Sequence, residues 1–318
     1  MRIITMHTSS GPIRVSLLIG AIVTTFLLTG CASISPDLAQ EETASWQEEP
    51  CFPVEQLNDD DRALADSLMR DAVNYQALYT LVGDLKPMST LVQKRFALAR
   101  PDSVVAGVRD AMKGEAAQAA YNDADQLHRV ADALSCGAVQ TVVVPFNATR
   151  EGNRTVQALL VDQRTLGRTL EDESPFWGQW AFTPNADPAT IITTVEHEAS
   201  LDRFRGYGYL FGYPEHAVTF FVEAARTGEE EDTFVERDFF HIPTAEAETS
   251  RFTYAVPEGY VPAEPDSTIH HRAMEILNLY RERRAHHKEE NDTLQPVELL
   301  REWYRDKPEL DPRRPGTE

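Results

Sequence analysis

The chain has 318 residues, 42% of them hydrophobic and 25% charged. This length accommodates one large domain or two ordinary ones, and the composition excludes a wholly disordered chain, a collagen and a multi-span membrane protein. The formal net charge of −21 comes from 51 acidic and 30 basic residues, and such an acidic surface repels the phosphates of nucleic acid, so we expect no nucleic-acid partner.

The start of the chain has the pattern of an export signal. Arg2 and Arg14 are the charged residues that precede position 31, and residues 15–28 form an apolar run. A helix that spans a bilayer needs about 20 apolar residues, so this run is too short for a stable anchor. A basic region followed by a short apolar region is typical of a secretory signal peptide.

The apolar run ends in Leu28-Thr29-Gly30-Cys31, which resembles the lipobox of bacterial lipoproteins. The resemblance implies cleavage before Cys31, addition of diacylglycerol to its thiol and, usually, acylation of its new amine. A thiolate is a suitable nucleophile for this transfer, and several acyl chains give a lasting attachment where one chain is marginal. The alternatives are an ordinary signal peptide and a short anchor helix that contains a cysteine.

The resemblance also implies a location. Ala32 follows Cys31, whereas an aspartate at this position commonly retains lipoproteins at the inner membrane of two-membrane bacteria. We therefore expect a signal peptide over 1–30, a lipidated cysteine with a flexible polar tether over 31–55, and lipid anchoring at the periplasmic face of the outer membrane. The membrane would then be a partner through the lipid.

The two remaining cysteines, Cys51 and Cys136, would lie in an oxidising compartment, which favours a disulfide between them. The bond would close a loop of 85 residues (136 − 51), worth about 4–5 kcal/mol in the chain-entropy model. The alternative is a pair of buried, unpaired thiols. We expect no metal site and no cofactor, because the sequence has no CxxC pair, Cys/His cluster, Walker loop or haem motif.

Helical patterns dominate the chain as far as Cys136. Asn58 is a suitable N-cap, three aspartates follow in the first turn, and apolar residues recur at helical spacing up to Leu81, before Gly83. Further helices are predicted over 91–99, 102–112 and 115–134.

Strand patterns begin after Gly137 and alternate with helices to the end of the chain. Residues 139–146 and 155–162 predict an antiparallel hairpin, and residues 234–242 and 251–256 a second strand pair. Pro214 suits the first position of a deeply buried helix that ends at Gly228. The other predicted helices cover 163–170, 189–197, 268–287 and 296–303.

This order of elements predicts an α+β fold, with a helical N-terminal half packed with antiparallel hairpins and a C-terminal helix. We expect a single globular domain over 56–305, within which residues 56–136 are a candidate helical subdomain, and a frayed tail over 306–318. The aromatic cluster Phe176-Trp177-Gly178-Gln179-Trp180 is expected to fill the core, with a glycan-binding patch as the alternative.

The segment 203–216 has the composition of a ligand site. Glycines alternate with tyrosines directly before a helix start, where free N–H groups attract anions. Two arginines can clamp a carboxylate or phosphate, tyrosines can stack on a sugar ring, and a histidine can act as a base. The candidate ligand-binding residues are Arg203, Arg205, Tyr207, Tyr209, Tyr213 and His216. The alternative is a glycine-bent strand whose tyrosines pack in the core.

Two functions follow from these patterns. The preferred one is a binding or envelope-structural role, with a small anionic ligand or a glycan as the partner, because the chain has no catalytic signature. The alternative is a hydrolase that acts on cell-envelope material through residues 203–216, with His197 or His216 as the catalytic base. The sequence leaves open whether the protein is an enzyme, and the patterns favour a protein that is not one.

Overall fold

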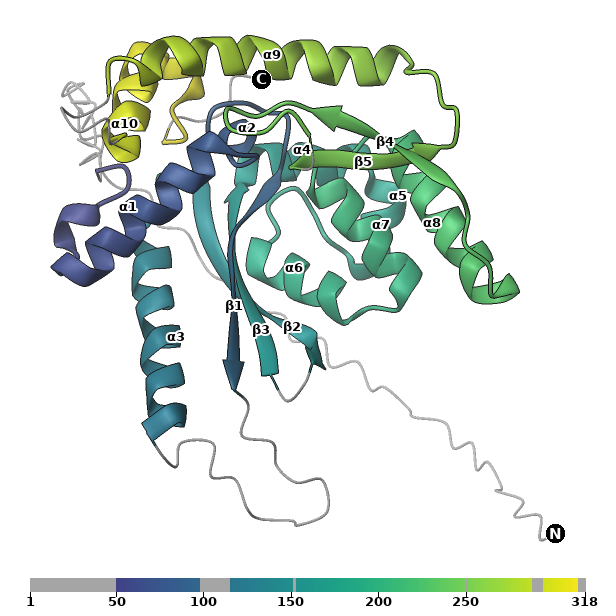
Figure 1. Cartoon of the computed structure of the whole chain (residues 1–318), viewed down its shortest axis with the longest axis horizontal. Coiled ribbons are helices and arrows are strands. Elements are labelled where there is room, and N and C mark those ends of the chain that lie inside the picture. Colours follow the sequence, from purple (N-terminus) through teal and green to yellow (C-terminus); the bar gives the residue numbers. More distant parts are fainter. Residues whose placement is uncertain (1–49, 98–114, 151–152, 250, 288–293, 314–318) are drawn as a thin grey trace, which may run out of the picture. The chain divides into compact units, whose positions relative to one another are not determined.

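The computed structural model describes residues 50–97, 115–150, 153–249, 251–287 and 294–313 (Figure 1). The predicted signal peptide, Cys31, the tether as far as residue 49 and the predicted helix 102–112 lie outside these residues. The described residues form helices and two small antiparallel sheets, which confirms the α+β class. None of the helices within the described ranges is long and apolar enough to cross a membrane.

The helices in the described ranges follow one another in chain order around the strands. The α-helices are α1 (Asp59–Asn74), α2 (Leu78–Leu81), α3 (Glu115–Ala133), α4 (Gln163–Asp172), α5 (Ser174–Trp177), α6 (Pro188–His197), α7 (Ser200–Leu210), α8 (Glu215–Glu231), α9 (Glu264–Arg284) and α10 (Pro296–Asp306). Three short 3-10 helices are η1 (Val54–Gln56), η2 (Gly178–Trp180) and η3 (Pro308–Leu310).

The larger sheet has three antiparallel strands in the order β1-β3-β2. Its strands are β1 (Met88–Ala97), β2 (Val139–Arg150) and β3 (Asn153–Asp162). The β2–β3 hairpin was predicted from its β-branched run, and Val139 pairs with Asp162 at its open end. The smaller sheet is the predicted hairpin of β4 (Arg237–Ile242) and β5 (Phe252–Pro257).

The prediction of a helix over 91–99 is wrong as far as residue 97, because these residues belong to β1. Val92 and Phe96 stand four residues apart, the spacing of a helix face, but Gln93 and Arg95 are exposed in alternation with them, as in a strand. β1 pairs with the edge of β3 that β2 leaves open, so long-range pairing decides the local structure. The same pairing joins β1 to the rest of the unit Glu48–Glu318.

Several helix boundaries also differ from the predicted ones. Pro214 is the N-cap of α8 and Glu215 its first residue, and the helix continues past Gly228 to Glu231. Helix α9 begins at Glu264 rather than at residue 268, with Asp266 in its first turn accepting the backbone N–H of Ala263. A carboxylate in the first turn is stabilised by the helix dipole, which explains the earlier start.

The predicted aromatic cluster fills a core on one side of the larger sheet. Trp177 is 0% exposed and packs edge-on against Phe176, in one hydrophobic cluster with Leu159 and Val161 of β3. The side chain of Leu160 lies in the other cluster, between β3 and helices α1 and α10. The hydrophobic core therefore lies on both faces of β3.

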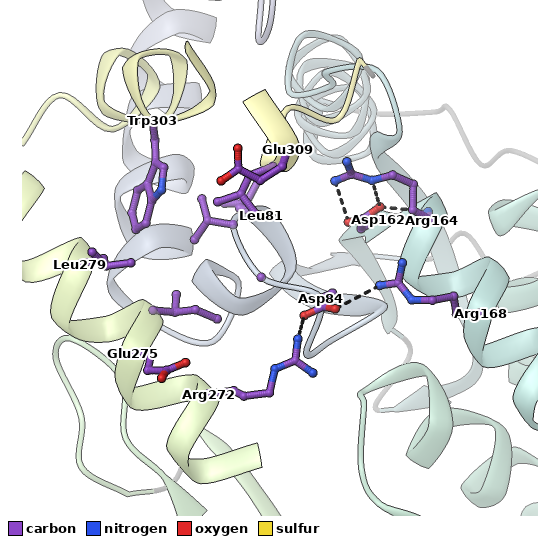
Figure 2. Close-up of a pocket in the computed structure, with 14 residues that line it drawn as sticks. Leu81, Asp84, Asp162, Arg164, Arg168, Arg272, Glu275, Leu279, Trp303 and Glu309 are labelled. Atoms are coloured by element: carbon purple, nitrogen blue, oxygen red, sulfur yellow. Dashed lines mark hydrogen bonds and ion pairs between the residues drawn. The ribbon is translucent and has the colours of Figure 1, made fainter. Parts of the chain in front are cut away.

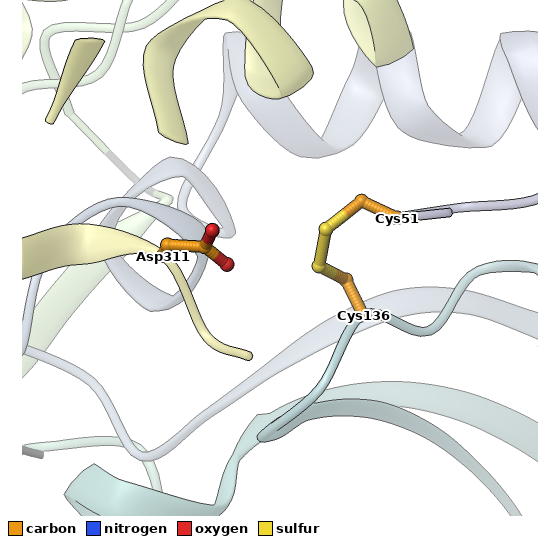
Figure 3. A group of neighbouring side chains, drawn as sticks. All are labelled: Cys51, Cys136 and Asp311. Carbon is orange, nitrogen blue, oxygen red and sulfur yellow. A yellow bond between two sulfur atoms is a disulfide. The ribbon is translucent and has the colours of Figure 1, made fainter. Parts of the chain in front are cut away.

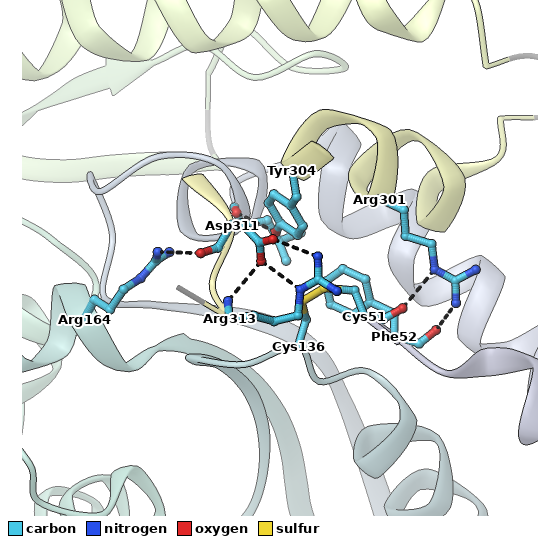
Figure 4. Close-up of a disulfide and its surroundings, with 9 residues drawn as sticks. Cys51, Phe52, Cys136, Arg164, Arg301, Tyr304, Asp311 and Arg313 are labelled. Carbon is cyan, nitrogen blue, oxygen red and sulfur yellow. Dashed lines mark hydrogen bonds and ion pairs between the residues drawn. A yellow bond between two sulfur atoms is a disulfide. The ribbon is translucent and has the colours of Figure 1, made fainter. Parts of the chain in front are cut away.

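A disulfide joins Cys51 to Cys136, next to the C-terminal segment (Figure 4). Arg301 of α10 donates to the carbonyl oxygens of Cys51 and Phe52 at 2.9 Å. The expectation of a frayed tail from residue 306 is wrong as far as residue 313, since Asp311 is buried and accepts three hydrogen bonds from Arg313. The backbone at Gly137 leaves no room for a Cβ against the Pro312 carbonyl, so the tail packs directly on the start of β2.

Removal of the disulfide should destabilise the fold. We expect Cys51→Ala with Cys136→Ala to lower the free energy of unfolding by about 4–5 kcal/mol, because the 85-residue separation is left open in the unfolded chain. Urea unfolding measures the change, and reduced wild-type protein is the matched control, expected to behave as the double variant does. Equal stability of the oxidised wild type and the variant would contradict the prediction.

Candidate ligand-binding site

The candidate segment 203–216 is a helix–turn–helix rather than a glycine-bent strand, so that alternative is wrong. A Cβ on Gly206 would lie 2.9 Å from the methyl groups of Val195, and one on Gly208 2.8 Å from a methyl group of Val218. The glycines of α7 therefore allow close packing against α6 and α8. Gly212 has a φ of +73° and turns the chain against the carbonyl of Leu85.

Arg205 is partly buried and pairs with the exposed Glu215. Its Nη1 lies 3.2 Å from the Tyr209 hydroxyl and 3.5 Å from Oε1 of Glu215. Tyr209 in turn donates to Oε2 of Glu215 at 2.5 Å, and Thr219 donates to Oε1 at 2.7 Å. Arg203 lies over the ring of Phe204. The described contacts of the two arginines therefore differ: Arg205 pairs with Glu215 of α8, whereas Arg203 lies over Phe204.

The side chains of the other candidate residues lie in separate parts of the protein. Tyr207 donates to the buried Glu196 at 2.6 Å, and burial raises its pKa. Tyr213 packs against the rings of Phe252 and Tyr254. His197 lies at the end of α6, where its Nδ1 is 2.8 Å from the Thr193 carbonyl oxygen. The six candidate residues therefore share no single site.

His216 is oriented by a buried carboxylate. Its Nε2 lies 3.1 Å from Oδ1 of Asp266, which is 0% exposed, and 3.2 Å from the Tyr260 hydroxyl. Tyr254 and Tyr260 donate to Asp266 at 2.6 and 2.7 Å. Burial alone would raise the pKa of Asp266, but the hydrogen bonds from these tyrosines and the Ala263 N–H outweigh it and lower the pKa below its ordinary value.

An aromatic groove of about 320 Å³ lies between α7, α8 and β5. Ring side chains provide most of its walls, among them two of the candidate tyrosines: Phe204, Tyr207, Phe211, Tyr213, Phe221, Phe239 and Tyr254. Thr253 contributes one of the few polar groups. The groove offers ring faces but few hydrogen-bonding partners for sugar hydroxyls.

Lys86 lies completely buried beside this groove. Its Nζ is 4.2 Å from the ring centroid of Phe252 and 5.4 Å from that of Phe211, and it has no hydrogen-bond partner among the described residues. Burial lowers the pKa of Lys86 from 10.5 to about 7, because no carboxylate compensates for the lost hydration. The ammonium form is therefore costly in the folded protein.

We expect Lys86→Met to stabilise the protein below pH 7, by about 2–5 kcal/mol. The unfolded chain binds this proton more tightly than the folded protein, so wild-type stability rises between pH 7 and 10.5. The variant lacks this dependence of stability on pH, and the free energies of unfolding of the two proteins become equal above pH 10.5. Urea unfolding across pH measures the effect, with the exposed Lys307→Met as the control. A variant less stable than wild type below pH 7 would contradict the prediction.

A second cavity, of about 450 Å³, is lined by arginines from two helices (Figure 2). Arg164 and Arg168 come from α4, and Arg272 comes from α9. Asp84 lies between Arg168 and Arg272, its Oδ2 3.6 Å from one guanidinium nitrogen of Arg168 and its Oδ1 hydrogen-bonded to Arg272. We name this space the arginine cavity; its volume is in the range of small-molecule sites.

The opposite end of the arginine cavity is apolar. Leu81, Ile276, Leu279 and Leu310 line it, and Figure 2 shows Leu279 and Trp303 on the side away from the arginines. Trp303 is 1% exposed, and its indole nitrogen has no hydrogen-bond partner in the described part of the chain. A buried donor of this kind is costly unless an acceptor meets it. The cavity therefore combines guanidinium groups and carboxylates with an apolar wall.

Sequence reasoning missed the arginine cavity. The residues that form it come from separate elements: the loop at Asp84, α4, α9 and α10. The one local signal was the four-residue spacing of Arg164 and Arg168 on a predicted helix, which places both on one face. Their convergence with Arg272 depends on the packing of α9.

Cys51, Cys136 and Asp311 are a group of potential metal ligands within the described ranges (Figure 3). Their ligand atoms lie within 4.8 Å of one another, but both sulfur atoms are bonded in the disulfide. Asp311 pairs with Arg313. In the oxidised protein this group has no thiolate to offer a metal.

Comparison with protein-family models, curated proteins and solved structures finds no match for this chain. The functional interpretation therefore rests on the geometry of the cavities in this protein.

Proposed function

We propose that the protein is a lipid-anchored binding protein at the periplasmic face of the outer membrane, which takes a small anionic ligand in the arginine cavity. The observation that carries the binding role is the convergence of Arg164, Arg168 and Arg272 on one cavity of about 450 Å³, in a chain of net charge −21. Four carboxylates also line this cavity, and buried Asp162 pairs with Arg164. The half-exposed Arg168 and Arg272 are therefore the groups that would receive an anion of matching geometry.

The donors for such an anion come from Arg168 and Arg272. Arg168 uses one nitrogen, Nη2, for both Thr165 and Asp84, and Arg272 uses Nη2 for Asp84. Their other guanidinium nitrogens have no partner among the described residues, and about half of each side chain is exposed. A carboxylate or phosphate can therefore receive hydrogen bonds from both residues, which gives both charge and planar complementarity.

The geometry favours the anionic ligand over the glycan. In the aromatic groove, the hydroxyl of Tyr207 already donates to Glu196, so the groove has few groups to bind sugar hydroxyls. In the arginine cavity, charged donors stand beside the apolar wall of Leu279 and Ile276. This combination suits a small anion with an apolar part.

Inorganic phosphate is the simplest probe of the arginine cavity. We expect saturable binding to the protein in isothermal titration calorimetry, and a loss of at least about tenfold in affinity in Arg168→Gln with Arg272→Gln, because two charge-assisted hydrogen-bond donors are removed. Arg226→Gln is the matched control, an exposed arginine of α8 that pairs with Glu223 outside the cavity. Absence of saturable binding, or an equal loss in the control, would refute the binding role.

The lipid anchor has its own test. In a bacterial host grown with an alkyne analogue of palmitate, we expect the wild-type protein to be labelled and Cys31→Ser to be unlabelled, because the thiol that takes the lipid is missing. Cys51→Ser is the matched control and should keep the label. Equal labelling of Cys31→Ser and wild type, or a mature protein that retains residues 1–30, would refute the anchor.

The hydrolase alternative has one observation in its favour. The carboxylate of Asp266 orients His216, as in sites where a histidine acts as a base. In the described part of the chain, however, the side-chain partners of His216 are Asp266 and Tyr260, with no serine, threonine or cysteine among them. A histidine with no nucleophilic side chain beside it supports catalysis less than the arginines support binding.

A further inference from the structure

Asp84 occupies the place in the arginine cavity where a ligand anion would bind. It lies in the loop between α2 and β1, and its two carboxylate oxygens contact guanidinium groups from α4 and α9 (Figure 2). An incoming carboxylate or phosphate would bind to these same two groups. The protein thus supplies its own anion to Arg168 and Arg272.

The contacts of Asp84 contrast with those of Asp162 in the same cavity. Asp162 is buried and binds Arg164 through both oxygens at 3.1 Å, while its Oδ1 also caps α4 by accepting the N–H of Arg164. Asp84 has 48% of its side chain exposed and makes one-point contacts with half-exposed arginines. Exposed ion pairs contribute little net stability, so the pairs of Asp84 are exchangeable, whereas the pair of Asp162 is structural.

We propose that Asp84 is an internal counter-ion that the ligand displaces. This inference rests on the proposed binding function. On binding, the ligand oxyanion accepts from the unpartnered guanidinium nitrogens of Arg168 and Arg272 and also from the Nη2 atoms that Asp84 contacts. The carboxylate of Asp84 then turns to water. Without a ligand, Asp84 neutralises part of the charge of Arg168 and Arg272. When a ligand is present, Asp84 competes with it for these two arginines. Asp84 therefore sets the lowest anion concentration at which the cavity fills.

The loop around Asp84 restricts the exchange to a side-chain rotation. On one side, Gly83 contacts Ile276 so closely that a Cβ would lie 2.4 Å from its Cδ1. On the other side, Lys86 is fully buried and the carbonyl of Leu85 packs against Gly212. The backbone is therefore fixed at both ends, while the half-exposed carboxylate can reach solvent without moving it.

The test compares two cavity carboxylates that differ in their contacts. Asp84→Asn weakens both pairs to Arg168 and Arg272, whereas Glu275→Gln removes a lining charge whose partner is His271. With inorganic phosphate as the probe in calorimetry, we expect Asp84→Asn to bind about tenfold more tightly than wild type. Glu275→Gln should gain no more than about twofold, as expected for a screened charge that does not compete.

The outcomes separate this inference from the function on which it rests. If wild type binds phosphate but Asp84→Asn binds equally, more weakly, or only as much more tightly as Glu275→Gln, the internal counter-ion is refuted and the binding function stands. If wild type does not bind phosphate, the binding function itself is refuted. Thermal unfolding verifies that each variant is folded, and Asp84→Ser provides the same comparison if the asparagine variant is not.

Discussion

The fold depends on the burial of β3 on both of its faces. Ala158, Leu159, Leu160 and Val161 are consecutive and each is 0% exposed, so each face of the strand has to be covered by other elements. Pairing with β1 and β2 satisfies its backbone on both edges. Helix α4 begins directly after β3, with Asp162 as its N-cap, and this rigid junction sets where Arg164 and Arg168 project. The arginine cavity is thus a consequence of the same strand that organises the core.

Local signals in the sequence predicted the elements whose stability is local. Asn58 and the aspartates after it predicted the start of α1, and the structure has Asn58 accepting the N–H of Asp61. The β-branched run predicted the β2–β3 hairpin. Elements fixed by distant contacts were missed: β1 is a strand because β3 has a free edge, and the glycines of α7 permit helix packing against Val195 and Val218. Glycine favours strand bends and close helix contacts alike, and the sequence alone does not distinguish them.

In the candidate site, too, residues that are close in sequence were recognised and those brought together by distant contacts were missed. The candidate residues of 203–216 are close in sequence, but helix geometry sends their side chains in different directions. Glu196 pairs with Tyr207, Glu215 with Tyr209 and Arg205, and Asp266 with His216. The arginine cavity combines residues that are far apart in the sequence, as in the Arg272–Asp84 contact, whose partners are 188 positions apart. Pairing over that separation leaves no periodic or motif signal, so it becomes visible only in three dimensions.

The disulfide has a mechanical consequence for a protein held by its N-terminal side. Cys51 is the second of the described residues, and its covalent link leads directly to Cys136 at the start of the larger sheet. A pulling force that enters the body at this end therefore passes through a covalent bond into the strands, and α1 is bypassed. The helix would stay folded under tension that would otherwise peel it from the core.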